Sequence, residues 1–205
     1  VYKRQKQDQW IKEESDRILK EYGNHPSFCM LAYGNEPSGN NQADYLNNLV
    51  VYWKENDGRR LYTSAGGWPL VKDADYFNTD HPRIGGIGRI ENILNIYTPC
   101  TNYDFRERLL KDLPVVSHEI GQWCVYPDFK EIDKYTGVLK AKNFEIFKET
   151  LNEKGLGDMA EKYLYASGRL QTLCYKMDIE AALRTPGFAG FQLLDLHDFP
   201  GQGTA

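Results

Sequence analysis

The chain has 205 residues, of which 41% are hydrophobic and 26% charged, and its net charge at pH 7 is -4. This composition predicts a globular protein with a hydrophobic core. The net charge is too small to indicate a strongly charged partner, and no basic cluster is interleaved with aromatics, so we expect no nucleic-acid partner. No apolar run reaches the ~20 residues that a transmembrane helix needs, so we expect no membrane partner.

The first half of the chain alternates between helical and strand patterns. Its helices show apolar residues on one face amid charges, and its first strand is a near-continuous apolar run, typical of a strand buried on both sides. The predicted elements are a helix over 2–22, a strand over 28–33, a helix over 42–55, a strand over 61–64 and an extended segment over 75–78. A glycine-rich segment over 84–88 lacks the flanking strand and helix of a phosphate loop and is interpreted as a flexible active-site loop.

The second half continues the alternation. The predicted elements are a strand over 93–97, a helix over 104–111, a strand over 115–117, a helix over 143–152, a long helix capped by Asp158 and ending near 183, and a strand over 188–194. We expect the buried face of the long helix to consist of Met159, Tyr163, Ala166, Leu170, Leu173, Met177 and Ala181. The segment over 121–140 is long enough to suggest a lid or a binding loop.

The order of the elements predicts an α/β fold, because strands that alternate with helices form a parallel sheet with covering helices. About five strands are visible, whereas a TIM (β/α)8 barrel has eight and typically ~250 residues. We therefore expect a partial TIM barrel that comprises roughly strands four to eight. Residues 1–205 would form a single domain, the C-terminal part of a catalytic barrel in a larger protein.

Two apolar runs end in a glutamate. The first leads to Gly34-Asn35-Glu36, and the second to Val115-Val-Ser-His118-Glu119. Strand ends from different strands meet at one face of a barrel, where its active site lies. Two carboxylates at that face are the equipment for cleaving a glycosidic bond, since one protonates the leaving oxygen and the other attacks the sugar or activates water. Glu36 and Glu119 are therefore the candidate catalytic residues.

With Asn24-His-Pro-Ser27 before the first motif, the chain resembles glycoside hydrolase family 2, the family of β-galactosidase, β-glucuronidase and β-mannosidase. The resemblance implies that Glu36 is the general acid/base, that Glu119 is the nucleophile and that Asn35 bonds the sugar 2-hydroxyl. It also implies that Tyr97, which closes the strand over 93–97, orients the nucleophile. The implied reaction is the retaining hydrolysis of O-glycosidic bonds, by exo action on β-glycosides. We expect a periplasmic or secreted bacterial enzyme.

Further residues are candidates for binding the carbohydrate. Trp68 and Trp123 lie in loops expected on the active face, where each would either stack on sugar or seal the base of its loop. Asp195 follows the last strand and is the candidate there, beside His197 and Asp198. His118 should point away from Glu119 unless a bulge intervenes, because successive side chains alternate along a strand.

Other functions stay open at this stage. An endo-acting β-glycanase of the same clan, or a non-catalytic carbohydrate-binding protein on a decayed barrel, would carry the same pattern. A metal centre built from His81, His118, Glu119 and His197 lacks the usual ligand spacing, so we expect no metal and no cofactor. Four widely spaced cysteines indicate neither a disulfide framework nor a zinc site, and Cys29 and Cys174 should be small buried hydrophobes. Besides the carbohydrate, the expected partners are a further copy of the chain or missing N-terminal domains.

Overall fold

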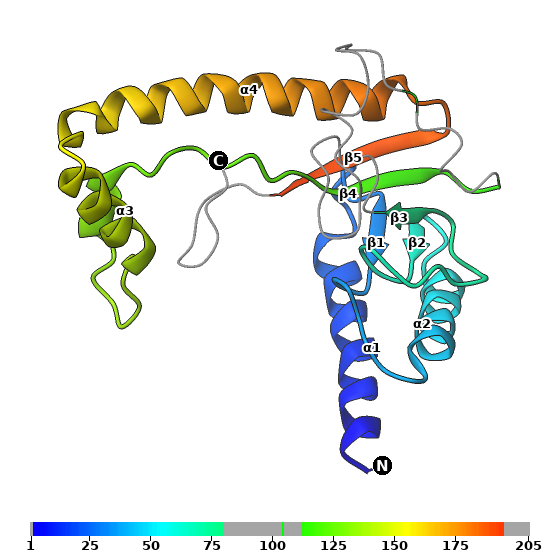
Figure 1. Ribbon diagram of the computed structural model, residues 1–205. Coiled ribbons are helices and arrows are strands. Elements are labelled where there is room, and N and C mark those ends of the chain that lie inside the picture. Colours follow the sequence, from blue (N-terminus) through cyan, green and yellow to red (C-terminus); the bar gives the residue numbers. More distant parts are fainter. Residues whose placement is uncertain (1, 80–103, 105–111, 195–205) are drawn as a thin grey trace. The chain divides into compact units, whose positions relative to one another are not determined.

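The computed structural model describes residues 2–79, 104 and 112–194 (Figure 1). The chain forms two compact units, Val1–Thr79 with Leu110–Val116 and Asp80–Leu109 with Ser117–Ala205. The predicted strand over 93–97, the glycine-rich segment over 84–88 and nearly all of the predicted helix over 104–111 lie outside the described residues. The assignment of residues 1–205 to one barrel domain remains a prediction.

The first unit confirms the predicted order of helices and strands. Its elements are α1 (Tyr2–Tyr22), β1 (Met30–Ala32), α2 (Gln42–Asn56), β2 (Leu61–Thr63) and β3 (Phe77–Thr79). β1 and β2 are parallel, with Met30 opposite Leu61 and Ala32 opposite Thr63. The parallel sense requires a crossover between the two strands, and α2 supplies it.

The core of this unit lies between α1, α2 and β2. The apolar face of α2 is buried as predicted, and its Trp53 ring stacks on Tyr62 of β2 with 5.8 Å between the ring centroids. The buried members of the core are Leu19, Leu46, Leu49, Val50, Trp53, Tyr62, Val71 and Ala74. β1 is only half-buried, which corrects the expectation of a strand buried on both sides. In the described part of the chain β1 pairs with β2 alone.

The second unit holds the long helix. Its elements are most of β4 (Val115–Gly121), the short 3-10 helices η3 (Phe129–Lys134) and η4 (Gly157–Met159), α3 (Lys142–Glu153), α4 (Ala160–Arg184) and β5 (Phe188–Leu194). β4 is the middle strand in the order β3-β4-β5. The Gln122 N–H donates to the Leu194 carbonyl oxygen at 3.1 Å, so the carboxyl ends of β4 and β5 lie together. The C-terminal part of α4 packs beside β5 (Figure 1).

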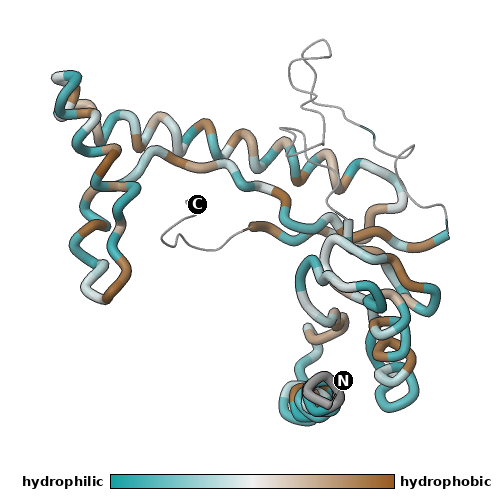
Figure 2. The backbone as a smooth tube through the Cα atoms, turned by 60° about the horizontal axis from the view of Figure 1, so that its bottom comes forward, coloured by the Kyte–Doolittle hydropathy of each residue, from teal (hydrophilic) through white to brown (hydrophobic). Residues whose placement is uncertain are grey.

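The buried face of α4 differs from the predicted one except at Ala181, which is buried as predicted. Hydrophobic and hydrophilic residues alternate along the helix (Figure 2), and the buried positions are Cys174, Asp178, Ala181 and Ala182. Leu170 and Leu173, which we predicted to be buried, are 61% and 63% exposed. The prediction that Asp158 caps this helix is also wrong, because Asp158 lies within η4 and the residue before α4 is Met159.

Taken together, the described residues form a mixed α/β structure with short parallel strands. Cys174 is buried as predicted, whereas Cys29, the residue before β1, is exposed, which corrects the expectation that it is a buried hydrophobe. None of the described helices combines the length and the apolar character needed to cross a membrane.

Candidate active site

The carboxyl ends of β1 and β2 carry three of the predicted site residues. Beyond the strands the two backbones stay paired, because Asn35 forms a parallel bridge with Gly66. The Glu36 N–H donates to the Gly66 carbonyl oxygen at 3.0 Å, and the Gly66 N–H donates to the Gly34 carbonyl oxygen at 2.8 Å. Backbone hydrogen bonds therefore hold Asn35 and Glu36 at the strand end where the sequence predicts the site.

Glu36 has a left-handed backbone, with a φ of 43°. Gly67 in the neighbouring segment also has a positive φ, 83°, and a Cβ atom there would lie 3.3 Å from the Glu36 Cγ atom. A side chain at position 67 would thus be strained and would press on the glutamate. Glu36 is exposed, so its side chain is accessible to a ligand.

Trp68 is hydrogen-bonded to the residue that follows Glu36. Its indole N–H donates to the Pro37 carbonyl oxygen at 3.0 Å, and the Trp68–Pro69 peptide bond is cis. The residue is 44% exposed although its ring nitrogen is bonded. An anchored aromatic ring with exposed surface is suited to stack on an apolar sugar face while its polar atom stays satisfied.

Glu119 lies inside β4 rather than after it. The sequence predicts a strand over 115–117 that delivers the glutamate at its end, but β4 continues to Gly121. Within the strand Glu119 has a φ of 55°, outside the extended range. The glutamate is therefore placed by a local kink in the strand and not by the strand's end.

The kink brings His118 and Glu119 together. Regular alternation would point them to opposite faces, yet the His118 Nε2 atom lies 3.3 Å from the Glu119 Oε1 atom. Their side chains are 12% and 19% exposed. The other ring nitrogen of His118, Nδ1, lies 2.9 Å from the Oε1 atom of Gln192 in β5. A carboxylate, an imidazole and an amide thus form a chain of contacts across β4 and β5.

Trp123 is anchored to α4. Its indole N–H donates to the Asp178 Oδ2 atom at 2.5 Å, and Asp178 is 2% exposed. The Gln171 side-chain amide donates to the Trp123 carbonyl oxygen. These contacts are those expected of a residue that seals the base of its loop, and a stacking role for Trp123 stays a prediction. The lack of a side chain at Gly121 allows the end of β4 to lie close to α4, since a Cβ atom at this position would be 2.2 Å from the Tyr175 ring of that helix.

Two of the predicted binding residues, Tyr97 and Asp195, lie outside the described residues, as do His81 and His197. Three residues that matter locally were not selected from the sequence: Gly67, Asp178 and Gln192. The two consecutive glycines before Trp68 could have indicated a backbone conformation that only glycine adopts easily, as Gly67 has. Asp178 and Gln192 give no such signal, because polar residues of helices and strands usually face solvent.

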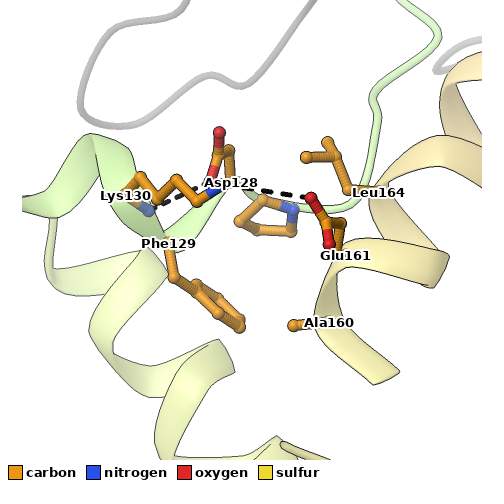
Figure 3. Close-up of a pocket in the computed structure, with 7 residues that line it drawn as sticks. Asp128, Phe129, Lys130, Ala160, Glu161 and Leu164 are labelled. Carbon is orange, nitrogen blue, oxygen red and sulfur yellow. Dashed lines mark hydrogen bonds and ion pairs between the residues drawn. The ribbon is translucent and has the colours of Figure 1, made fainter. Parts of the chain in front are cut away.

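A cavity of about 160 Å³ in the second unit contains none of the predicted site residues. Figure 3 shows side chains of η3 and of the start of α4 on two sides of it. An ion pair between the Lys130 Nζ and Glu161 Oε1 atoms, 3.9 Å apart, lies at its exposed rim. Its lining residues are Pro127, Asp128, Phe129, Lys130, Ala160, Glu161 and Leu164.

No protein-family model matches the chain, and no curated protein sequence matches it either. Within the described ranges, no group of three or more His, Cys, Asp and Glu side chains is arranged to hold a metal ion. Function is therefore inferred from the residues at the two strands and from their geometry.

Proposed function

We propose that the chain is the catalytic part of a retaining glycosidase that acts on β-glycosides, with Glu36 as acid/base and Glu119 as nucleophile. The proposed setting is a partial (β/α)8 barrel of strands four to eight, and exo action on a terminal sugar is part of the proposal. The supporting observation is the backbone conformation of the two glutamates, which the sequence motifs did not anticipate.

Positive φ angles are rare for residues with a side chain. Among the described residues only Glu36, Glu119 and Gln122 combine a side chain with a positive φ. Each such conformation costs on the order of 1–3 kcal/mol and persists only where the surrounding structure enforces it, which happens most often at active sites and ligand clamps. Two of the three strained positions are the two glutamates that the sequence selects for catalysis. This coincidence supports a catalytic role over that of two ordinary surface carboxylates.

The proposed reaction is a double displacement. The ionised Glu119 attacks the anomeric carbon and forms a glycosyl ester, while the bond from that carbon to the leaving oxygen breaks and the protonated Glu36 gives its proton to that oxygen. Glu36, now ionised, takes a proton from water, whose oxygen attacks the anomeric carbon and releases Glu119. Two inversions give net retention, and both glutamates return to their starting protonation states.

The surrounding residues fit the needs of such a substrate. Asn35 is positioned by the backbone beside Glu36, where its amide could bond a sugar hydroxyl. Trp68 supplies a partly exposed ring that is hydrogen-bonded to the carbonyl oxygen of Pro37, the residue after Glu36. A carbohydrate is recognised by hydrogen bonds to its hydroxyl groups and by stacking of its apolar face on an aromatic ring. The Asn35 amide and the Trp68 ring are suited to these two contacts.

The roles of the two glutamates are tested with Glu36→Ala and Glu119→Ala in the full-length protein. The substrate is a nitrophenyl glycoside, identified by screening a set of different sugars. Nitrophenolate leaves without a proton, so Glu36→Ala should still be glycosylated rapidly, accumulate the glycosyl-enzyme and be rescued by azide with retained configuration. Glu119→Ala forms no such intermediate, and azide should give the inverted glycosyl azide.

The matched control is Glu55→Ala, since Glu55 is an exposed glutamate of α2 outside the site. It should leave turnover unchanged. If the two glycosyl azides have the opposite configurations, the roles of Glu36 and Glu119 are exchanged. If both variants keep full activity without azide, the proposed function is wrong.

A further inference from the structure

We propose that His118 is a positioning residue for Glu119, and that Gln192 holds the imidazole in the orientation this role requires. The proposal rests on the proposed function, in which Glu119 is the nucleophile. It adds two residues to the reaction, one beside the carboxylate and one on the neighbouring strand.

The contact exists because of the backbone of Glu119. In a regular strand His118 and Glu119 would lie on opposite faces, and the left-handed φ of 55° places them on one side instead. The Nε2–Oε1 distance of 3.3 Å follows from that turn. Local strain of this kind is maintained only by surrounding interactions, and the His118–Glu119 contact is one that a regular strand cannot make.

Gln192 determines which ring nitrogen faces the carboxylate. The Oε1 atom of Gln192 is an acceptor 2.9 Å from the His118 Nδ1 atom, so Nδ1 carries a proton and donates it. The ring is then fixed with Nε2 toward Glu119. When Nε2 also carries a proton, it donates that proton to the carboxylate oxygen. Both ends of the ring thus have a defined partner.

The expected benefit is geometric. The attacking carboxylate must lie close to the anomeric carbon with the correct orientation, and a misplacement of ~1 Å can cost about 100-fold in rate. A glutamate side chain has several rotatable bonds, so a fixed neighbour at Oε1 reduces the orientations it samples. Low exposure of both side chains, 12% and 19%, keeps water from replacing that neighbour.

The test compares His118→Ala, Gln192→Leu, Gln192→Glu and the double variant His118→Ala/Gln192→Leu in the full-length protein. The measured quantity is kcat/KM for the nitrophenyl glycoside found by screening, because this ratio reports the step in which Glu119 attacks. We expect His118→Ala to lower kcat/KM about 100-fold. Gln192→Leu should lower it about 10-fold, as one lost hydrogen bond of ~1.4 kcal/mol would. The inhibition constant of the product sugar should change little.

The double variant separates positioning from independent effects. If Gln192 acts only through His118, the double variant should be as slow as His118→Ala alone. Gln192→Glu keeps an acceptor for Nδ1 and should stay near the wild-type rate. The matched controls are His25→Ala, an exposed histidine far from β4 in sequence, and Leu193→Ala, a 49% exposed neighbour of Gln192. Neither should change kcat/KM.

Three outcomes would overturn the proposal: a wild-type kcat/KM for His118→Ala, additive losses in the double variant, or a Gln192→Glu variant as slow as Gln192→Leu. Should His118→Ala fail to fold, the exposed Gln192 still gives the test through its own two variants. Glu119→Ala distinguishes the two levels of inference. If Glu119→Ala keeps full activity, the proposed function fails, whereas a dead Glu119→Ala beside fully active His118 variants rejects the positioning role alone.

Discussion

Asp57 and Arg60 form a buried ion pair, with side chains that are 7% and 3% exposed. The Arg60 guanidinium also donates to the Gly23 carbonyl oxygen at the end of α1 and lies 4.4 Å from the centre of the Phe28 ring. Asp57 is the C-cap residue of α2. The pair therefore connects the ends of both helices to β2, which supports the strand pair that carries Glu36.

Replacing Asp57 by Asn should destabilise the protein by about 3 kcal/mol, because it leaves the buried Arg60 without its counter-charge. The side-chain hydrogen bond from Arg59 is the main cause that holds the pKa of the Asp57 carboxyl below its ordinary value of 3.8. Since the folded-state pKa is lowered, this stabilisation is present above pH ~4 and is lost as the pH falls through the folded-state value. Urea unfolding at pH 7 and pH 3 measures both effects.

The pH dependence is the more specific part of this prediction. Wild-type protein should lose more free energy of unfolding between pH 7 and pH 3 than Asp57→Asn does. Glu55→Gln, at an exposed position two residues earlier, is the matched control and should behave as wild type. An Asp57→Asn variant with wild-type stability at both pH values would show that the ion pair contributes nothing net.

Among the elements, α4 shows how a buried polar contact fixes a loop. Asp178 is 2% exposed and accepts the indole N–H of Trp123 at 2.5 Å. Gln171, about two helical turns earlier on α4, donates its side-chain amide N–H to the Trp123 carbonyl oxygen. Both partners lie on the side of α4 that also buries Cys174. The helix thus holds the segment that leaves β4 just after Glu119.

Trp123→Phe should lower the free energy of unfolding by about 2 kcal/mol, since it removes a hydrogen bond to a buried carboxylate. Asp178→Asn should cost less, because its amide oxygen can still accept the indole N–H. A double-mutant cycle between the two positions should give a coupling of at least ~0.5 kcal/mol. If Trp123 acts only as a loop anchor and does not touch the sugar, the KM for a glycoside should stay near wild type. A raised KM with unchanged stability would instead indicate direct contact with sugar.

The same helix shows where sequence patterns reach their limit. Periodicity located α4 well, but it favoured the stripe that contains Leu170 and Leu173, which proved exposed, over the one that contains Cys174 and Asp178. Adjacent stripes on a helix differ by only one residue in register, and the choice between them depends on what packs against the helix. From the sequence alone, Asp178 would be placed on the solvent-exposed face of the helix, because its hydrogen-bond partner Trp123 is not evident from the local sequence.

β1 and β4 give a similar lesson for the candidate site. The apolar runs in the sequence located both strands and both glutamates, because a run of apolar residues is a local signal for a buried strand. The left-handed conformation of Glu36 and Glu119 was not predicted, since glutamate gives no local signal for it. The contact between His118 and Gln192 was not predicted either. The two residues are 74 positions apart in the sequence and meet only when β4 and β5 pair.

At the scale of the whole molecule, the two glutamates belong to different compact units. Glu36 lies in the unit that ends with Val116, and Glu119 in the unit that resumes at Ser117. The boundary therefore passes through β4, between Val116 and Ser117. If both carboxylates act on one sugar, as proposed, they must lie close together in the full-length protein. The distance between them can be measured directly.

An experimental structure of the full-length protein should place the Glu36 and Glu119 carboxyl groups about 5–5.5 Å apart, as retention requires, because the nucleophile and the acid/base must both reach the anomeric centre. A separation of about 6.5–9.5 Å would leave room for a water molecule between carboxylate and sugar and would indicate an inverting enzyme instead. The stereochemistry gives an independent check: NMR of the first-formed product should show the anomer of the substrate. Carboxyl groups more than ~10 Å apart, beyond either class, would contradict the assignment of these two residues to one active site.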